Sequence, residues 1–180
     1  MIRSLSLLAL SSLVALSVSP RPAAAQANPF HFNIAAGAAV PTGDLSDITN
    51  TGYNITGGLG LSLPLSPIGF RAEGFFNQFG FKDEVGGGHF NVGGANANII
   101  VGMPVPSIVG SSLYGIGGIG WYNTHDDAVD FSENNIGFNI GAGFKFPLTG
   151  FSAYVEARYH QVSNEGQDAK FFPIVFGLVF

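Results

Sequence analysis

The chain has 180 residues, of which 46% are hydrophobic and only 11% are charged, with twelve acidic residues, seven basic residues and a net charge of −5. It has no cysteine, which excludes a disulfide scaffold, a thiolate metal site and a lipidated N-terminal cysteine. The few basic residues form no cluster, so nucleic acid is not an expected partner. The fold must therefore keep a large apolar surface away from water without the help of disulfide bonds.

The first 25 residues have the layout of a secretory signal peptide. Arg3 provides a short positive region, an apolar run extends from about Leu5 to Val18, and small residues surround Ala25 and Ala27. Cleavage after Ala25 or after Ala27 fits this layout equally well. A transmembrane helix is the alternative, but the apolar run is too short for one and is closed by Ser, Pro and Arg. We expect residues 1–25 to direct export.

The remaining domain, residues 28–180, consists of segments in which apolar and polar residues alternate, separated by turn residues. Such alternation is typical of a β-strand with one apolar face. We expect eight strands of about ten residues each and no helix. The segments are residues 30–41, 53–64, 69–81, 91–104, 112–122, 135–147, 151–160 and 171–180.

The connections between these segments alternate in character. The short, Pro-bearing ones are "PLSPI", "PVPSIVGS" and "PLTG", and the polar, mostly longer ones are "TGDLSDITNTG", "KDEVGGGH", "NTHDDAVDFSEN" and "QVSNEGQDAK". Consecutive hairpins with all long loops at one end produce this rhythm. The sequence therefore predicts an all-β fold, an eight-stranded antiparallel up-and-down β-barrel.

Alternation alone does not show whether the apolar face points into the barrel or toward lipid, and the charged residues in the strands help to decide between the two. A soluble periplasmic, lipocalin-like binding barrel would bury that face, whereas an outer-membrane barrel would turn it toward lipid. The polar face is mostly Gly, Asn, Ser, Thr, Ala and Tyr, which suits a lumen filled by side chains. Its five charged residues nearly balance, and the third and seventh strands lie across the barrel from each other, so we expect a lumen ion network. Its members are Arg71, Glu73, Lys145, Glu156 and Arg158.

Aromatic residues gather toward both ends of the predicted strands, as they do at the two interfaces of a membrane. The group at the short-turn end is Phe32, Phe70, Phe144, Phe146, Phe151 and Phe180. The group at the long-loop end is Tyr53, Phe81, Phe90, Trp121, Tyr122, Tyr159 and Phe172. Two such belts favour the lipid-facing arrangement, a transmembrane β-barrel.

The stretches "FRAEGFF", "YVEARYH" and "FFPIVFGLVF" resemble the small outer-membrane β-barrel proteins, the OmpA/OmpX-like eight-stranded group, over essentially the whole mature chain. The resemblance implies a monomer in the cell outer membrane, in contact with outer-membrane lipid and lipopolysaccharide. It also implies that the barrel-assembly machinery reads the last strand. The residues to which it assigns this role are Phe172, Ile174, Phe176, Gly177, Leu178 and Phe180.

Pro173 departs from this pattern. It cannot donate a hydrogen bond to a neighbouring strand. We therefore expect a strand end or a bulge at this position.

One segment suggests catalysis. "RYHQVSNEG" looks similar to the His-x-Ser-Asn motif of outer-membrane lipid A 3-O-deacylases, in which the two residues share a strand face and the His acts as base for the Ser. Here His160 and Ser163 are three positions apart, which places them on opposite faces of a regular strand. A lipid A-modifying hydrolase therefore stays the alternative, and a structural or surface-interaction role is the main expectation.

The acidic segment near residue 130 suggests a second alternative, a Ca²⁺ or Mg²⁺ site formed by Asp126, Asp127, Asp130 and Glu133. Its spacing does not match the calcium loop of an EF-hand, and no glycine supplies the sharp turn. The preferred interpretation is a solvated acidic loop, which leaves open a contact with lipopolysaccharide phosphates through bridging divalent ions. No resident metal and no cofactor is expected.

Overall fold

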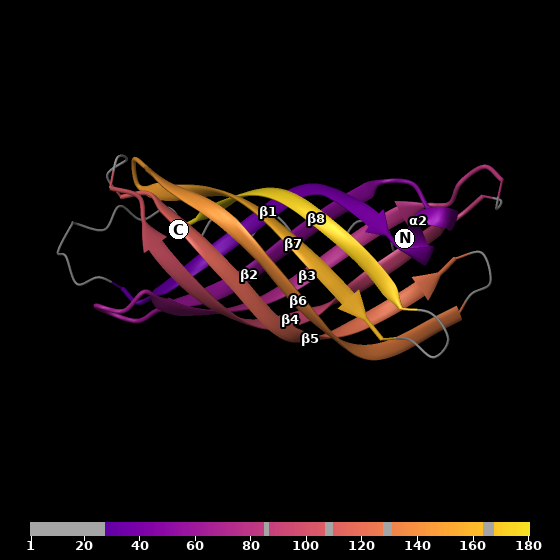
Figure 1. Ribbon diagram of the computed structural model, residues 1–180, viewed down its shortest axis with the longest axis horizontal. Helices are drawn as coiled ribbons and strands as arrows, with labels where there is room; N and C mark the ends of the chain where they lie inside the picture. The colour runs from indigo at the N-terminus through magenta and orange to yellow at the C-terminus, as the bar shows by residue number, and fades with distance from the viewer. Residues whose placement is uncertain (1–27, 85–86, 107–109, 128–130, 164–167) are drawn as a thin grey trace, which may run out of the picture.

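The computed structural model describes residues 28–84, 87–106, 110–127, 131–163 and 168–180 (Figure 1). The expected signal peptide lies outside these residues. Eight antiparallel strands follow one another and close into a barrel, which confirms the expected fold class. In chain order they are β1 (Phe30–Thr42), β2 (Gly52–Ser62), β3 (Ile68–Gly80), β4 (His89–Pro104), β5 (Ser112–Asp126), β6 (Phe131–Leu148), β7 (Phe151–Val162) and β8 (Ala169–Val179).

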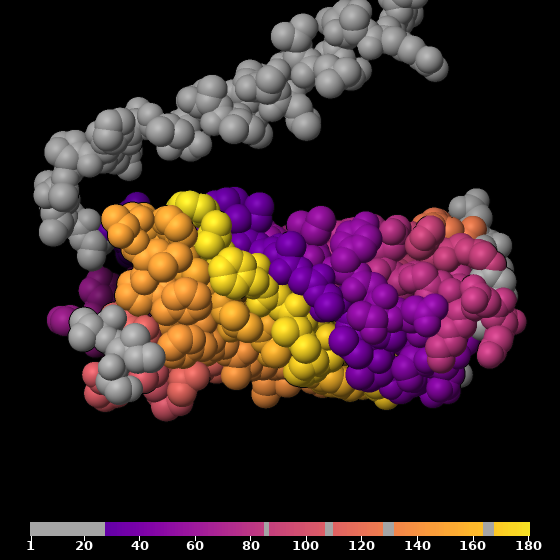
Figure 2. All heavy atoms as spheres, turned by 90° about the horizontal axis from the view of Figure 1, so that it is seen from above, coloured from indigo at the N-terminus to yellow at the C-terminus, as the bar shows by residue number. Residues whose placement is uncertain are grey.

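The seam between β8 and β1 closes the barrel. The two strands pair antiparallel from Asn33 opposite Val179 to Thr42 opposite Lys170. Figure 2 shows β8 in yellow lying beside β1 in indigo along the barrel wall. Closure leaves every strand with two neighbours, so no unpaired edge remains.

The apolar face of the strands points outward. Large apolar side chains on the outer wall are strongly exposed, among them Leu59 at 65%, Ile119 at 67% and Ile140 at 61%. The charged strand residues Arg71 and Glu156, by contrast, are buried inside at 6% and 1%. The soluble barrel with an inward apolar face is therefore wrong, because the charged strand residues lie inside and the apolar face of the strands lies on the outer wall.

The two ends of the barrel differ in their connections. The turns that follow β2, β4 and β6 lie at one end together with the start of β1 and with Phe180, whose backbone N–H donates to the Phe32 carbonyl at 2.8 Å. The loops that follow β1, β3, β5 and β7 lie at the other. Short turns of outer-membrane barrels are periplasmic and long loops extracellular. We call these the inner end and the outer end.

The strands range from 11 residues in β2, close to the expected segment, to 18 in β6, which is much longer than expected. The largest difference concerns β5 and β6, which stay paired as far as Asp126 opposite Phe131. The expected loop of residues 123–134 is therefore reduced to 127–130. Alternation of apolar residues ends at the lipid boundary, but the hydrogen-bonded ladder continues into water, so hydropathy underestimates strand length.

A short helix, α2 (Asp44–Ile48), follows β1 where no helix was expected. The Ser46 hydroxyl donates to the Gly43 carbonyl at 2.6 Å, and the Thr49 hydroxyl donates to the Leu45 carbonyl at 2.7 Å. Leu45 is 5% exposed and joins the apolar cluster in the outer half of the lumen. The helix therefore anchors the first loop onto the outer mouth. Within the described residues, no helix is long or apolar enough to cross a membrane.

Pro173 produces neither a strand end nor a bulge, so that prediction is wrong. The β7–β8 register is the same on both sides of it, with Ala157 opposite Ile174 and His160 opposite Phe171, and only the pairs between these are missing from the ladder. A closed barrel fixes β8 from both neighbours, because Pro173 still pairs with Ala39 of β1. The missing donor is therefore a local gap rather than a shift in register.

Candidate functional site

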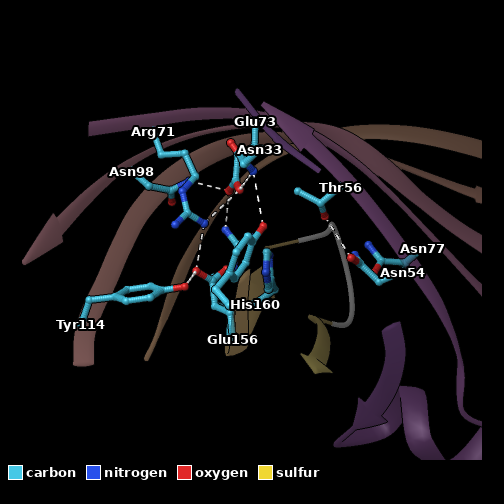
Figure 3. Close-up of polar contacts among 12 residues, drawn as sticks. Asn33, Asn54, Thr56, Arg71, Glu73, Asn77, Asn98, Tyr114, Glu156 and His160 are labelled. Atoms are coloured by element: carbon cyan, nitrogen blue, oxygen red, sulfur yellow. Dashed lines mark hydrogen bonds and ion pairs between the residues drawn. The ribbon is translucent and has the colours of Figure 1, made fainter. Parts of the chain in front are cut away.

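Four charged side chains meet in the middle of the lumen, and Figure 3 labels three of them, Arg71, Glu73 and Glu156. Arg71 Nη1 of β3 lies 2.9 Å from Glu156 Oε2 of β7, and Arg158 Nη1 of β7 lies 2.7 Å from Glu73 Oε2 of β3. Along each strand, Arg71 Nη1 is 3.3 Å from Glu73 Oε1 and Arg158 Nε is 2.9 Å from Glu156 Oε1. Two positive and two negative charges thus alternate around a neutral ring, which we call the lumen ion network.

Neutral side chains bind the carboxylates of this network. The Asn33 amide donates to Glu73 Oε1 at 3.2 Å, and the Asn98 amide donates to Glu73 Oε2 at 3.1 Å. The Tyr114 hydroxyl donates to Glu156 Oε2 at 2.7 Å. These bonds supply the extra partners that a buried ion pair needs to offset its desolvation. The network therefore spans β1, β3, β4, β5 and β7.

Two tyrosine rings lie close to the guanidinium group of Arg71. Its guanidinium carbon lies 5.7 Å from the ring centroid of Tyr114 and 5.3 Å from that of Tyr154, within range of a cation–π interaction. Each ring lies over a glycine on the neighbouring strand, Tyr114 over Gly143 and Tyr154 over Gly177. A Cβ atom at either glycine would collide with the ring. These glycines therefore make room for the side chains that position Arg71.

This packing predicts the effect of Gly177→Ala. The added methyl group displaces the Tyr154 ring from Arg71, and we expect the free energy of unfolding to fall by about 1–3 kcal/mol, the usual cost of overpacking. The measurement is denaturant unfolding in lipid vesicles. Gly115→Ala is the matched control, because a Cβ at Gly115 has no atom within 4 Å. Equal effects of the two substitutions would show that the ring does not require Gly177.

Lys145 was expected in the network but lies outside it. It pairs across the ladder with Tyr154, nearer the inner end than Glu156, which pairs with Gly143. Within the described part of the chain, no carboxylate lies within 4.0 Å of its amino group. The network therefore contains four of the five charged residues predicted for it.

An aromatic cluster fills the outer half of the lumen. Phe79 and Phe171 are fully buried with their ring centroids 5.8 Å apart, and Phe171 also stacks on His160 at 4.9 Å. The Tyr122 hydroxyl bonds to His160 Nδ1 at 2.9 Å. Further members are Ala39, Leu45, Phe75, Val92, Val162 and Ala169. Tyr122 and the partly buried Phe90 thus pack inside, and their expected place in the outer aromatic belt is wrong; Trp121, next to Tyr122 on the strand, is the lipid-facing residue.

The structure does not bring the two residues of the hydrolase alternative together. His160 is 2% exposed inside the lumen, where Tyr122 and Phe171 surround it. Ser163 is exposed and follows the end of β7 at Val162. In the described residues no hydrogen bond joins His160 to Ser163, so the pair lacks the contact that a base and nucleophile need.

Three of the four acidic residues of the metal alternative lie within the described residues, and Asp130 lies outside them. Asp127 Oδ1 is 3.1 Å from His125 Nε2 and accepts a hydrogen bond from the Asn91 amide at 3.1 Å. Asp126 and Glu133 belong to the strand pair β5–β6. Among the residues that the structure describes, no group of three or more His, Cys, Asp or Glu is arranged to hold a metal ion.

The residues assigned to assembly all lie on β8 or directly after it. Ile174, Phe176 and Phe180 are exposed on the outer wall at 46%, 53% and 59%. Phe180 also packs against Phe151, with ring centroids 5.8 Å apart. Gly177 instead belongs to the inward face, under Tyr154. The strand thus carries a lipid-facing stripe on one side and a packing position on the other.

An apolar outer wall around a lumen filled by paired charges and aromatic rings defines an integral outer-membrane β-barrel. The family model of the outer membrane protein beta-barrel domain matches residues 10–180, so the chain belongs to that family. A comparison with curated proteins finds no match.

Solved structures share the fold at low identity. Neisserial surface protein A is 12% identical with a TM-score of 0.68, over 84% of this chain and 96% of that one. Ail, the attachment invasion locus protein of Yersinia pestis, in complex with the heparin analogue sucrose octasulfate, is 19% identical with a TM-score of 0.50, over 84% and 99%. The N-terminal β-barrel domain of Pseudomonas aeruginosa OprF is 17% identical with a TM-score of 0.50, over 83% and 97%.

Proposed function

We propose that this protein is a closed outer-membrane anchor, with a structural or surface-interaction role carried by its four outer loops. The observation that carries the proposal is the double filling of the lumen, by the ion network in the middle and by the aromatic cluster toward the outer end. An eight-stranded barrel is narrow enough for side chains to fill its interior. Function therefore falls to the surfaces outside the lumen.

The charge of the outer end suggests its partner. Acidic side chains are exposed there in α2 and in the loops after β3 and β5, for example Asp47, Asp83, Glu84 and Asp127. Lys170 is a basic side chain at this end, and its charge is paired, because its amino group lies 3.5 Å from the carboxylate of Asp168. Carboxylates bind divalent cations, which in turn bind phosphate. We therefore propose contact with lipopolysaccharide phosphates through bridging divalent ions; a polyanion such as the one bound to Ail does not suit this acidic end.

The same proposal covers biogenesis and catalysis. Residues 1–25 direct export, β8 is read by the barrel-assembly machinery, and the mature barrel is a monomer in outer-membrane lipid. It is not a lipid A hydrolase, because His160 is enclosed by Tyr122 and Phe171 while Ser163 lies beyond the strand. The exported protein thus reaches the membrane as an anchor without chemistry of its own.

One preparation tests closure and catalysis. The mature chain is refolded into liposomes that contain lipopolysaccharide and a trapped small solute. We expect solute release at the rate of protein-free liposomes, because the lumen is filled, and an unchanged mass spectrum of lipid A. Rapid release, or loss of an acyl chain from lipid A, contradicts the proposal.

Metal removal tests the loop contact. Barrels in nanodiscs are expected to retain soluble lipopolysaccharide in Mg²⁺ and to lose it when a chelator removes the ion. The double variant Asp83→Asn, Glu84→Gln is expected to retain less, because two exposed carboxylates are lost. Retention that is insensitive to chelation would mean that the loops do not use bridging cations.

A further inference from the structure

A cavity of about 840 Å³ opens at the inner end of the barrel. The inward side chains of His31, Arg71, Tyr114 and Lys145 line it, together with Ser111 and described residues of the turns after β2 and β4. Arg71 and Tyr114, which both bind Glu156 of the ion network, are also part of this lining. We call this cavity the inner vestibule. Because the aromatic cluster fills the outer half of the lumen, a ligand would enter the vestibule from the periplasm.

The inner vestibule is basic although the chain as a whole is acidic. Its lining contains His31, Arg71 and Lys145 but no Asp or Glu. Among the described residues, every acidic side chain belongs either to the ion network or to the outer end. The two Glu residues of the network neutralise Arg71 and Arg158. Among the described residues, Lys145 has no carboxylate within 4.0 Å of its amino group, and it lines the same cavity as Arg71.

Two buried donors in the vestibule wall have no partner. Arg71, which is 6% exposed, leaves its Nε–H group without a hydrogen bond, and Ser111, which is 4% exposed, leaves its hydroxyl without one. Buried polar groups in folded proteins are nearly always hydrogen-bonded, so orphan donors require an explanation. Both residues line the same cavity as Lys145. The wall thus contains one ammonium group that has no carboxylate partner among the described residues, and two buried donors, a guanidinium N–H and a hydroxyl, that have no hydrogen-bond partner.

We propose that the inner vestibule binds an oxyanion, the carboxylate or phosphate group of a small ligand on the periplasmic side. Arginine and lysine form their strongest hydrogen bonds with such anions. Lys145 supplies the charge, and the Arg71 Nε–H and the Ser111 hydroxyl, which are buried in the wall, supply directed donors when their side chains turn toward the anion. The anion has two possible sources, a free small molecule or the headgroup of an anionic lipid in the inner leaflet, and the same chemistry recognises either.

The test uses the mature barrel in nanodiscs of neutral phosphatidylcholine, titrated with inorganic phosphate or acetate against chloride at constant ionic strength. The readout is the NMR chemical shift of Ser111 and of the Lys145 side chain. We expect saturable shifts with at least one of the two anions. Lys145→Gln is expected to weaken binding about tenfold, because one hydrogen bond to a charged group is lost. Lys170→Gln, at the outer end, is the matched control and leaves binding unchanged.

A second arm distinguishes the sources. Nanodiscs that contain phosphatidylglycerol, with no added phosphate or acetate, are compared with the neutral ones. Shifts at Ser111 in these discs, lost in Lys145→Gln, assign the site to a lipid headgroup; shifts only with the free anions assign it to a soluble ligand. Lys145→Arg keeps the charge and is expected to retain binding, which separates loss of charge from misfolding. Absence of saturable shifts in both arms, or equal effects of Lys145→Gln and Lys170→Gln, overturns the proposal.

Discussion

Glu156→Gln is expected to lower the free energy of unfolding by about 3–5 kcal/mol, because it leaves an uncompensated positive charge in the lumen. The native ion network is neutral: Glu156 forms ion pairs with Arg71 and Arg158 and accepts hydrogen bonds from Arg71 and from the Tyr114 hydroxyl. Glutamine has nearly the same shape and keeps one acceptor, so packing changes little. The measurement is denaturant unfolding in lipid vesicles, followed by the difference in gel mobility between the folded and the boiled barrel.

A double variant separates charge balance from the loss of contacts. Glu156→Met combined with Arg158→Met removes one charge of each sign and leaves the Arg71–Glu73 pair, whose atoms are 3.3 Å apart. Replacement of a buried ion pair by apolar side chains of similar volume is often nearly neutral. We expect the double variant to be more stable than Glu156→Gln. Asp83→Asn, at an exposed loop position, is expected to change stability by less than about 0.5 kcal/mol.

The stability of Glu156→Gln also shows whether water enters the lumen. If Glu156→Gln were as stable as the parent, water in the lumen would be screening the charges, and the barrel would conduct small solutes. The proposed anchor requires the opposite result. Stability and solute release therefore test the same property, exclusion of water by the filled lumen.

The ion network could be predicted from the sequence because the fold is simple. Period-two alternation assigns each residue to the lumen or the wall, and an up-and-down barrel of eight strands places β3 opposite β7. Those two facts bring Arg71 and Glu73 toward Glu156 and Arg158. The depth of a residue along the barrel, however, depends on the stagger between strands. Lys145 has the correct face but the wrong depth, which alternation alone does not reveal.

The alternation of inward and outward residues also contradicts part of the predicted outer aromatic belt. Trp121 and Tyr122 are neighbours on β5, so only one of them can face lipid, and the structure turns Tyr122 inward. The same parity places Tyr114 and Tyr154 in the lumen, where they enclose Arg71. The short helix α2 is harder to predict from the sequence, because a single helical turn shows no periodic pattern of apolar residues. Its only apolar residues are Leu45 and Ile48, and of these Leu45 is the buried one.

The aromatic cluster should matter as much to stability as the ion network. Phe171→Ala is expected to lower the free energy of unfolding by about 3–5 kcal/mol, the cost of truncating a buried phenylalanine and leaving a cavity. Phe171 is fully buried and contacts both Phe79 and His160. Phe138→Ala is the matched control, because Phe138 is 44% exposed on the outer wall. Lipid chains can fill the space that it leaves, so its effect should be smaller.

The same variant shows whether the lumen is sealed once or twice. The ion network lies on the inner side of the aromatic cluster and contains none of its residues. Phe171→Ala alone is therefore expected to leave solute release at the parent rate despite its lower stability. Combined with Glu156→Gln, which disrupts the second seal, it is expected to raise solute release. If Phe171→Ala alone opens the barrel, the ion network is permeable to small solutes and the aromatic cluster is the sole barrier.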